Sequence, residues 1–201
     1  GFARLLKPQG VATFEFPHLL RLVEKNQFDT IYHEHFSYLS LTAITRIFER
    51  NGLCVFDVEE LSTHGGSLRV FAQRRDTGRC EATNHVARML ARENTAGMAA
   101  TDFYSGFQAR ADQVKNDFIA FLVEAKRAGK TVAAYGAAAK GNTLLNYAGI
   151  RPDLLPYVVD RNPAKQEKFL PGSRIPIVAE TCIRDHRPDY VVILPWNLRN
   201  E

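Results

Sequence analysis

Apolar and polar positions follow two different patterns in the two halves of the chain. In the first half, β-prone apolar runs at residues 11–16, 53–58 and 67–73 predict three strands. Between the first two strands, Ser40 is a good helix N-cap and precedes apolar residues at helical spacing. The last two strands are separated by a short Gly-rich turn at residues 63–66. We therefore expect them to form an antiparallel hairpin at a sheet edge.

The second half alternates strands with helices. Strands are predicted at 131–135, 157–159 and 190–194, and helices at 142–148 and 180–185. This alternation is typical of a parallel, doubly wound α/β sheet. The intervening residues predict a linker with a helix around 84–93 and then a long amphipathic helix over 101–128, which Gly129 ends. We expect this long helix to bridge two domains.

Composition narrows the class of protein. Of 201 residues, 45% are hydrophobic and 24% are charged, which is ordinary for a globular protein and argues against disorder or a fibre. No run approaches the roughly 18 apolar residues that span a bilayer, so we expect no membrane partner. The net charge of +4 weakly favours an anionic ligand and does not indicate nucleic acid. Three scattered cysteines exclude a disulfide framework within the chain and fit a reduced, cytoplasmic setting.

The densest group of reactive side chains lies between Tyr32 and Tyr38. It contains His33, Glu34 and His35 and falls between a polar turn and a capped helix, where catalytic groups often gather. A histidine beside a carboxylate and a phenol can act as a general base near neutral pH. A metal site on the two histidines and a purely structural turn are the alternatives. The absence of an HExxH motif makes the metal site the weakest of the three.

Two glycine-containing segments could bind phosphate. In the first, His64 and Gly66 lie in a turn whose backbone N–H groups could approach an anion, and Ser67 and Arg69 follow the turn. The alternative is a hairpin turn with a solvated arginine, which the turn taken alone favours.

The second glycine-containing segment is the loop Gly136–Thr143. It follows a strand and opens a helix, but Lys140 and Asn142 do not match the P-loop spacing, so an NTPase is not expected. Asp160 ends the next strand, where an acidic group can bind ribose hydroxyls. A nucleotide site and simple close packing of helix on strand remain equal alternatives here. Trp196 and Asn197 end another strand at the same edge, where the tryptophan could stack on a base or belong to the core.

Five segments taken together resemble the C-terminal half of the sugar C-methyltransferases. In order, they read NQFDTIYHEHFSYLSL, THGGSLRVF, VAAYGAAAKGNTLLNYAGI, VVDRNPAKQEKFLPGSRIPI and PDYVVILPWNL. Enzymes of this family use S-adenosylmethionine to methylate nucleotide-linked keto-deoxysugars. The family combines an N-terminal zinc-binding module, a methyltransferase Rossmann domain and a C-terminal Rossmann-like domain.

The resemblance implies a domain organisation. Residues 1–75 would be the last strands of the methyltransferase domain, 76–128 a helical linker, and 129–201 the Rossmann-like domain that binds substrate. The cofactor's Gly-rich loop and the zinc-binding cysteines would lie upstream of Gly1. Because the chain does not begin with Met, we expect it to be cut within a domain and to be inactive alone, with no metal of its own.

The resemblance also implies residue roles. His35 would remove a proton next to the sugar ketone, Tyr32 and Glu34 would orient the base or stabilise the oxyanion, and the enolate carbon would attack the sulfonium methyl group. The partner would be a nucleoside-diphosphate sugar. The position of four residues in the expected fold makes them candidate substrate ligands: Lys140, Asn142, Asp160 and Asn197. Further candidates are Tyr38, His64, Gly66, Ser67 and Arg69. A non-catalytic nucleotide-binding module is the alternative, whereas the absence of GxGxxG argues against an oxidoreductase.

Overall fold

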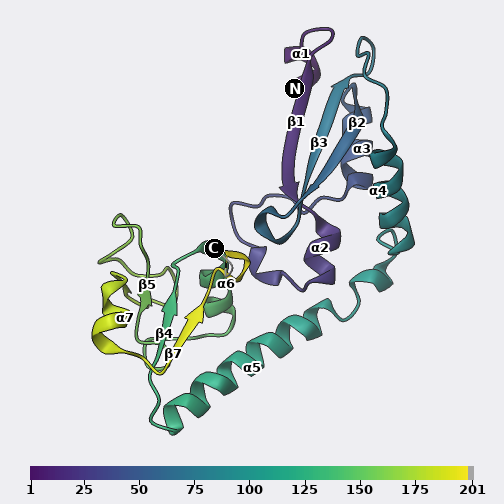
Figure 1. Ribbon diagram of the computed structural model, residues 1–201. Coiled ribbons are helices and arrows are strands. Elements are labelled where there is room, and N and C mark those ends of the chain that lie inside the picture. Colours follow the sequence, from purple (N-terminus) through teal and green to yellow (C-terminus); the bar gives the residue numbers. More distant parts are fainter. Residues whose placement is uncertain (199–201) are drawn as a thin grey trace. The chain divides into compact units, whose positions relative to one another are not determined.

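The computed structural model describes residues 1–198 and divides the chain into two compact units (Figure 1). Unit 1 contains Gly1–Gln27 and Phe36–Phe107. Unit 2 contains Phe28–His35 and the chain from Gln108 onward. A short segment near the beginning of the sequence therefore folds with the second half of the chain.

Unit 1 is built on a three-stranded antiparallel sheet of β1 (Val11–Pro17), β2 (Leu53–Leu61) and β3 (Ser67–Arg74). The strand order is β1-β3-β2, so the predicted β2–β3 hairpin is confirmed. β3 lies in the centre because β1 pairs along its other side, from Val11 opposite Gln73 to Pro17 opposite Ser67. The central position fits the burial of the β3 side chains Leu68 and Val70.

The helices of unit 1 are α1 (Phe2–Leu5), α2 (Leu19–Glu24), α3 (Leu41–Arg50) and α4 (Asn84–Thr95). Single 3-10 turns occur at Thr63–Gly65 and Thr101–Tyr104. α3 begins where the sequence predicts, because the Ser40 hydroxyl accepts a hydrogen bond from the Ala43 N–H at 3.0 Å. Its apolar face buries Leu41, Ile44 and Phe48 in the core of the unit.

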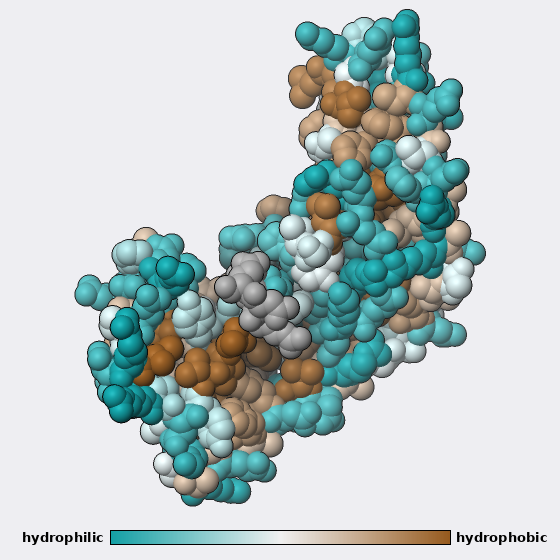
Figure 2. Space-filling model, in the orientation of Figure 1, coloured by the Kyte–Doolittle hydropathy of each residue, from teal (hydrophilic) through white to brown (hydrophobic). Residues whose placement is uncertain are grey.

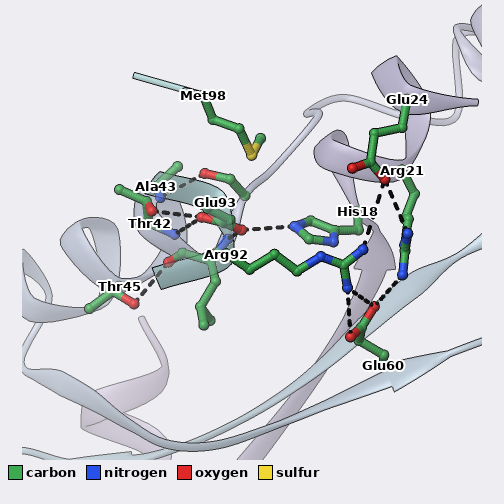
Figure 3. Close-up of polar contacts among 12 residues, drawn as sticks. His18, Arg21, Glu24, Thr42, Ala43, Thr45, Glu60, Arg92, Glu93 and Met98 are labelled. Atoms are coloured by element: carbon green, nitrogen blue, oxygen red, sulfur yellow. Dashed lines mark hydrogen bonds and ion pairs between the residues drawn. The ribbon is translucent and has the colours of Figure 1, made fainter. Parts of the chain in front are cut away.

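A buried carboxylate joins α4 to the start of α3 (Figure 3). Glu93 accepts hydrogen bonds from the backbone N–H groups of Leu41 at 2.6 Å and Thr42 at 2.8 Å, and from the Thr42 hydroxyl at 2.6 Å. The same carboxylate lies 2.8 Å from Nε2 of His18, and both side chains are almost fully buried. Glu93 thus satisfies backbone donors that the first turn of a helix leaves without partners.

Unit 2 is built on a parallel sheet in the order β6-β5-β4-β7. Its strands are β4 (Val132–Tyr135), β5 (Val158–Val159), β6 (Ile177–Val178) and β7 (Tyr190–Ile193), and its helices are α5 (Phe107–Arg127), α6 (Ala139–Tyr147) and α7 (Thr181–His186). Leu122 of α5 and Leu145 of α6 are fully buried against the sheet. This mixed α/β unit with parallel strands confirms the expected Rossmann-like fold class.

The edge strand β7 leaves part of its apolar side exposed. Tyr190, Val191 and Ile193 are each 40–49% exposed, and brown, hydrophobic surface is visible over this part of unit 2 (Figure 2). Nothing in the described part of the chain is a helix long and apolar enough to cross a membrane.

The boundaries of the two compact units differ from the expected domain boundaries at residues 75 and 128. Unit 1 extends to Phe107 and includes α4, whereas the segment Phe28–His35 falls outside it. The assignment of residues 1–75 to a methyltransferase domain stays a prediction.

Candidate functional site

The segment Phe28–His35 is held on α6 of unit 2. It begins with a single 3-10 turn, Phe28–Thr30, whose phenylalanine ring lies 5.4 Å from the Tyr147 ring, centroid to centroid. The Tyr147 hydroxyl donates to Asp112 of α5 at 2.6 Å, which fixes this ring in turn. Tyr32 and His35, which belong to the same segment, therefore follow a phenylalanine that packs into unit 2.

Tyr32 and His35 lie side by side in this segment. Their ring centroids are 4.3 Å apart with an interplanar angle of 33°, and the His35 backbone N–H donates to the Tyr32 carbonyl at 2.9 Å. Nδ1 of His35 is 2.7 Å from the Thr30 carbonyl oxygen. Because a carbonyl can only accept, Nδ1 carries the hydrogen in the neutral ring and Nε2 is the basic nitrogen. Glu34 is exposed in the turn between them.

The arrangement of Tyr32 and His35 suits proton abstraction. A backbone carbonyl selects one neutral tautomer of His35, and the tilted phenol ring lies against the imidazole. Among residues 1–198, no group of three or more His, Cys, Asp or Glu side chains is placed to hold a metal ion.

A second polar cluster lies in the same unit, where strand β7 ends. The 3-10 turn Trp196–Leu198 follows that strand, and the Trp196 indole N–H donates to Oδ2 of Asp29 at 2.6 Å. The Lys140 ammonium lies 4.6 Å from the centroid of the Trp196 ring and donates to Oδ1 of Asn197 at 3.2 Å. Two predicted ligands, Lys140 and Asn197, are thus brought together, and Asp29 joins them.

Burial changes the acid–base behaviour of this cluster. Desolvation raises the pKa of Asp29, although its hydrogen bond from Trp196 and the charge of Lys140 oppose the rise. Desolvation lowers the pKa of Lys140, which the charge of Asp29 opposes. Each residue is 6% exposed. The opposite charges are therefore partners within a largely desolvated environment.

Asp160 holds the loop before α6. Its carboxylate accepts from the backbone N–H groups of Ala137 and Asn162, each at 2.8 Å, and from Nζ of Lys165 at 3.1 Å. Lys165 also donates to the Ala137 carbonyl at 2.9 Å. Burial alone would raise the pKa of Asp160, but these hydrogen bonds outweigh it and lower the pKa. Both carboxylate oxygens thus accept hydrogen bonds from other groups of the protein. The ribose-binding role of Asp160 stays a prediction.

The glycines of the loop Gly136–Thr143 permit close packing. A Cβ atom on Gly136 would lie 2.6 Å from Cδ of Pro195, and one on Gly141 would lie 2.6 Å from Cβ of Leu194. This favours packing over ligand binding for these two glycines. Asn142, by contrast, has a buried Oδ1 atom with no hydrogen-bond partner in the described part of the chain, so it could accept a hydrogen bond from a ligand.

The remaining predicted ligands belong to unit 1. Arg69 pairs with Glu15 at 3.0 Å and Glu59 at 3.6 Å across neighbouring strands, as a solvated structural arginine would. Ser67 is buried and donates to the Thr63 carbonyl at 3.2 Å, and Tyr38 is half-buried.

In the turn before β3, His64 is exposed with a φ of 55°. Gly66 has a φ of 132° and leaves no room for a Cβ beside Arg21. This turn lines a cavity of about 300 Å³ together with Arg21 and Lys25.

Two residues at these sites were missed in the sequence analysis. Asp29 was assigned only to a polar turn, although it lies three positions before Tyr32 and beside an anchoring phenylalanine. Lys165 follows Asp160 by five positions, and no motif in the sequence predicts its contacts with Asp160 and the Ala137 carbonyl. A buried acid and a lysine carry no local pattern, so only their contacts in the fold reveal them.

Comparison with known proteins identifies the family. The model of the family described as "C-methyltransferase C-terminal domain" matches residues 62–201. The chain is 41% identical over all 201 residues to the C-methyltransferase NovU of Streptomyces niveus. The match covers 48% of that protein, so this chain spans about half the length of the relative. Both findings confirm the resemblance seen in the five sequence segments, and the chain belongs to the C-methyltransferase family.

Proposed function

We propose that this chain supplies the catalytic base and the substrate-holding domain of an S-adenosylmethionine-dependent C-methyltransferase whose substrate is a nucleotide-linked keto-deoxysugar. The observation that carries the proposal is the hydrogen bond from Nδ1 of His35 to the Thr30 carbonyl, because it leaves Nε2 as the basic nitrogen. The name of the Streptomyces niveus relative supports the reaction class, C-methylation.

In the proposed reaction, a ketone acidifies the neighbouring C–H bond of the sugar. Nε2 of His35 takes this proton and becomes an imidazolium, while the electron pair of the C–H bond moves into the enolate. Tyr32 orients the base or donates a hydrogen bond to the oxyanion, and Glu34 orients the base or accepts hydrogen bonds from the sugar hydroxyls. The cofactor supplies an electrophilic methyl group when it is bound.

The residues described do not form a recognisable cradle for that cofactor. Unit 1 contributes an antiparallel sheet with no parallel strand–loop–helix unit among its described strands. In unit 2, the small-residue loop that opens α6 has its glycines packed against Pro195 and Leu194. We therefore assign this chain substrate binding and proton removal.

For the substrate, the proposed site lies at the carboxyl ends of the strands in unit 2. Asn142 is supported by its orphaned buried oxygen, and the +4 net charge suits a diphosphate group. Lys140, Asp160 and Asn197 remain proposed ligands, although each already bonds to other protein groups. Substrate binding by residues of unit 1, such as His64 and Arg69, also remains a proposal. A cytoplasmic location is a proposal too.

The test compares His35→Ala with His33→Ala, an exposed neighbour that serves as the matched control. It uses a chain that extends over the full length of the relative. We expect His35→Ala to lower methyl transfer from labelled S-adenosylmethionine by about 10²–10⁴-fold without loss of cofactor binding. Near-normal turnover by His35→Ala would refute the proposal that His35 is the catalytic base. Binding of a nucleoside diphosphate without any transferase activity would favour the non-catalytic module instead.

A further inference from the structure

We infer that Asp29, Trp196 and Lys140 form a clamp that positions the His35 base, an inference that rests on the proposed function. We call these three residues the Asp29 clamp. They are positioning residues, because they act on His35 through the backbone of the segment Phe28–His35. The clamp ties that segment to the end of the parallel sheet of unit 2.

The first part of the clamp is the hydrogen bond between Trp196 and Asp29. It joins residues 167 positions apart, from the start of the segment to the turn after β7. The 2.6 Å distance and the burial of the acceptor make it a strong bond to a largely desolvated carboxylate. An indole has a single N–H donor, so this contact sets the position of Asp29 relative to β7.

The second part is the position of Lys140 over the Trp196 ring. Its ammonium lies against the face of the indole, whose edge donates to Asp29. Burial lowers the pKa of Lys140, and the negative charge of Asp29 opposes this change. Lys140 is in the first turn of α6, so the clamp joins the segment to both α6 and β7.

The third part is the short path from the clamp to the base. Asp29 directly precedes Thr30, which is almost fully buried and whose carbonyl accepts the hydrogen bond from Nδ1 of His35. A displacement of Asp29 therefore moves the acceptor that fixes the tautomer of the base. Because misplacement of a reacting group by about 1 Å can cost about 10²-fold in rate, this path is short enough to affect the reaction.

Within the Asp29 clamp, Lys140 helps to hold the segment Phe28–His35 in place. Here the ammonium is buried between the Trp196 ring and Asn197. Its contacts are those of a residue that holds the segment in place.

The first experiment measures the tautomer of His35 in the 201-residue chain. Imidazole ¹⁵N spectra are recorded near pH 8, with the signal assigned by its loss in His35→Gln. We expect the native chain to show only the form with hydrogen on Nδ1, and Trp196→Phe to show both neutral tautomers. Phenylalanine keeps an aromatic face beside Lys140 and removes the donor to Asp29, together with part of the area of the indole.

Asp29→Asn is the second variant, because it keeps the shape and an acceptor oxygen and removes the charge that faces Lys140. We expect a smaller tautomer change than in Trp196→Phe. The matched control is Asp189→Asn, which removes a carboxylate bonded to Thr131 and Lys130 where β4 and β7 begin. It should leave the His35 signal unchanged.

The second experiment measures methyl transfer by the same variants in a chain of the relative's full length. Trp196→Phe should lower kcat by about 10–100-fold with little change in KM, and Asp189→Asn should not. If Trp196→Phe and Asp29→Asn behave like Asp189→Asn in both experiments, the clamp is refuted while the proposed function stands. If the tautomer changes but the unsubstituted full-length chain transfers no methyl group to any nucleotide-linked ketosugar, the clamp stands and the proposed function fails.

Discussion

Glu93 is 1% exposed and is nevertheless stabilised in its charged form. Burial by itself would raise the pKa of this carboxyl group. The hydrogen bonds from His18, the Thr42 hydroxyl and the first backbone N–H groups of α3 outweigh burial and hold the pKa below its ordinary value of 4.5. One side chain thus connects α4, the start of α3 and the end of β1, and its charge stabilises the folded state of unit 1.

We predict that Glu93→Gln lowers the free energy of unfolding by about 1.5–3 kcal/mol at pH 7, the contribution of hydrogen bonds to a charged group. Because the folded pKa is depressed, this contribution is complete above the unfolded pKa and is lost as pH falls through the folded pKa. The gap between the native chain and the variant should therefore narrow below about pH 4.5. Urea unfolding between pH 7 and pH 3 measures it.

Glu59→Gln is the control for Glu93→Gln, since Glu59 is an exposed glutamate 3.6 Å from Arg69. It should change stability by no more than about 0.5 kcal/mol. A gap for Glu93→Gln that stays constant across this pH range would show that the charge of Glu93 does not stabilise the fold.

At the scale of single residues, the sequence indicates reactive side chains that lie close together along the chain. It does not indicate side chains that are brought together only by the tertiary fold. Tyr32, Glu34 and His35 fall within four positions, so their density alone predicts a reactive site. Asp29 acquires its environment from Trp196, and Glu93 acquires its environment from His18 and Thr42. Such pairings depend on the tertiary fold, and no spacing in the sequence encodes them.

At the scale of elements, strong local signals predict the structure well. The Ser40 cap and the Gly129 stop lie where helices begin and end, and the three strands of unit 1 differ from prediction mainly in their ends. The sequence does not predict β6, a strand of two residues, Ile177 and Val178. α6 begins at Ala139, three residues earlier than predicted, and its Gly141 packs closely against Leu194, which follows β7.

We predict that Gly141→Ala destabilises unit 2 by about 1–3 kcal/mol, although alanine is the better helix former. The added Cβ would lie 2.6 Å from Cβ and 2.9 Å from Cδ1 of Leu194, closer than packed atoms allow. Thermal unfolding of the single variant and of Gly141→Ala combined with Leu194→Ala measures the coupling. The double variant should lose less than the sum of the single losses, and strictly additive losses would contradict this account.

At the scale of the whole molecule, each unit has its own hydrophobic core. Leu41, Leu53 and Leu68 belong to the core of unit 1, and Leu122 and Leu145 to that of unit 2. The sequence predicts two folded regions and their α/β class. It does not predict that residues 28–35 join the second region, because that assignment depends on contacts with α6, far along the chain.

We predict that the segment Phe28–His35 loses protection together with unit 2. Leu145→Ala and Leu68→Ala each remove a fully buried side chain and should cost about 2–5 kcal/mol. Hydrogen exchange followed by mass spectrometry should show faster exchange in residues 28–35 for Leu145→Ala and little change there for Leu68→Ala. The reverse result would place the segment with unit 1.

The family domain that matches residues 62–201 is a unit of sequence similarity and not a unit of folding. A fragment expressed from residue 62 would contain β3 without either neighbouring strand, and so would expose two strand edges prone to aggregation. It would also lack the segment 28–35, although that segment folds with unit 2. Exchange of parts between relatives should therefore keep residues 28–35 and 108–198 from the same parent, so that the proposed base and its supporting sheet are inherited together.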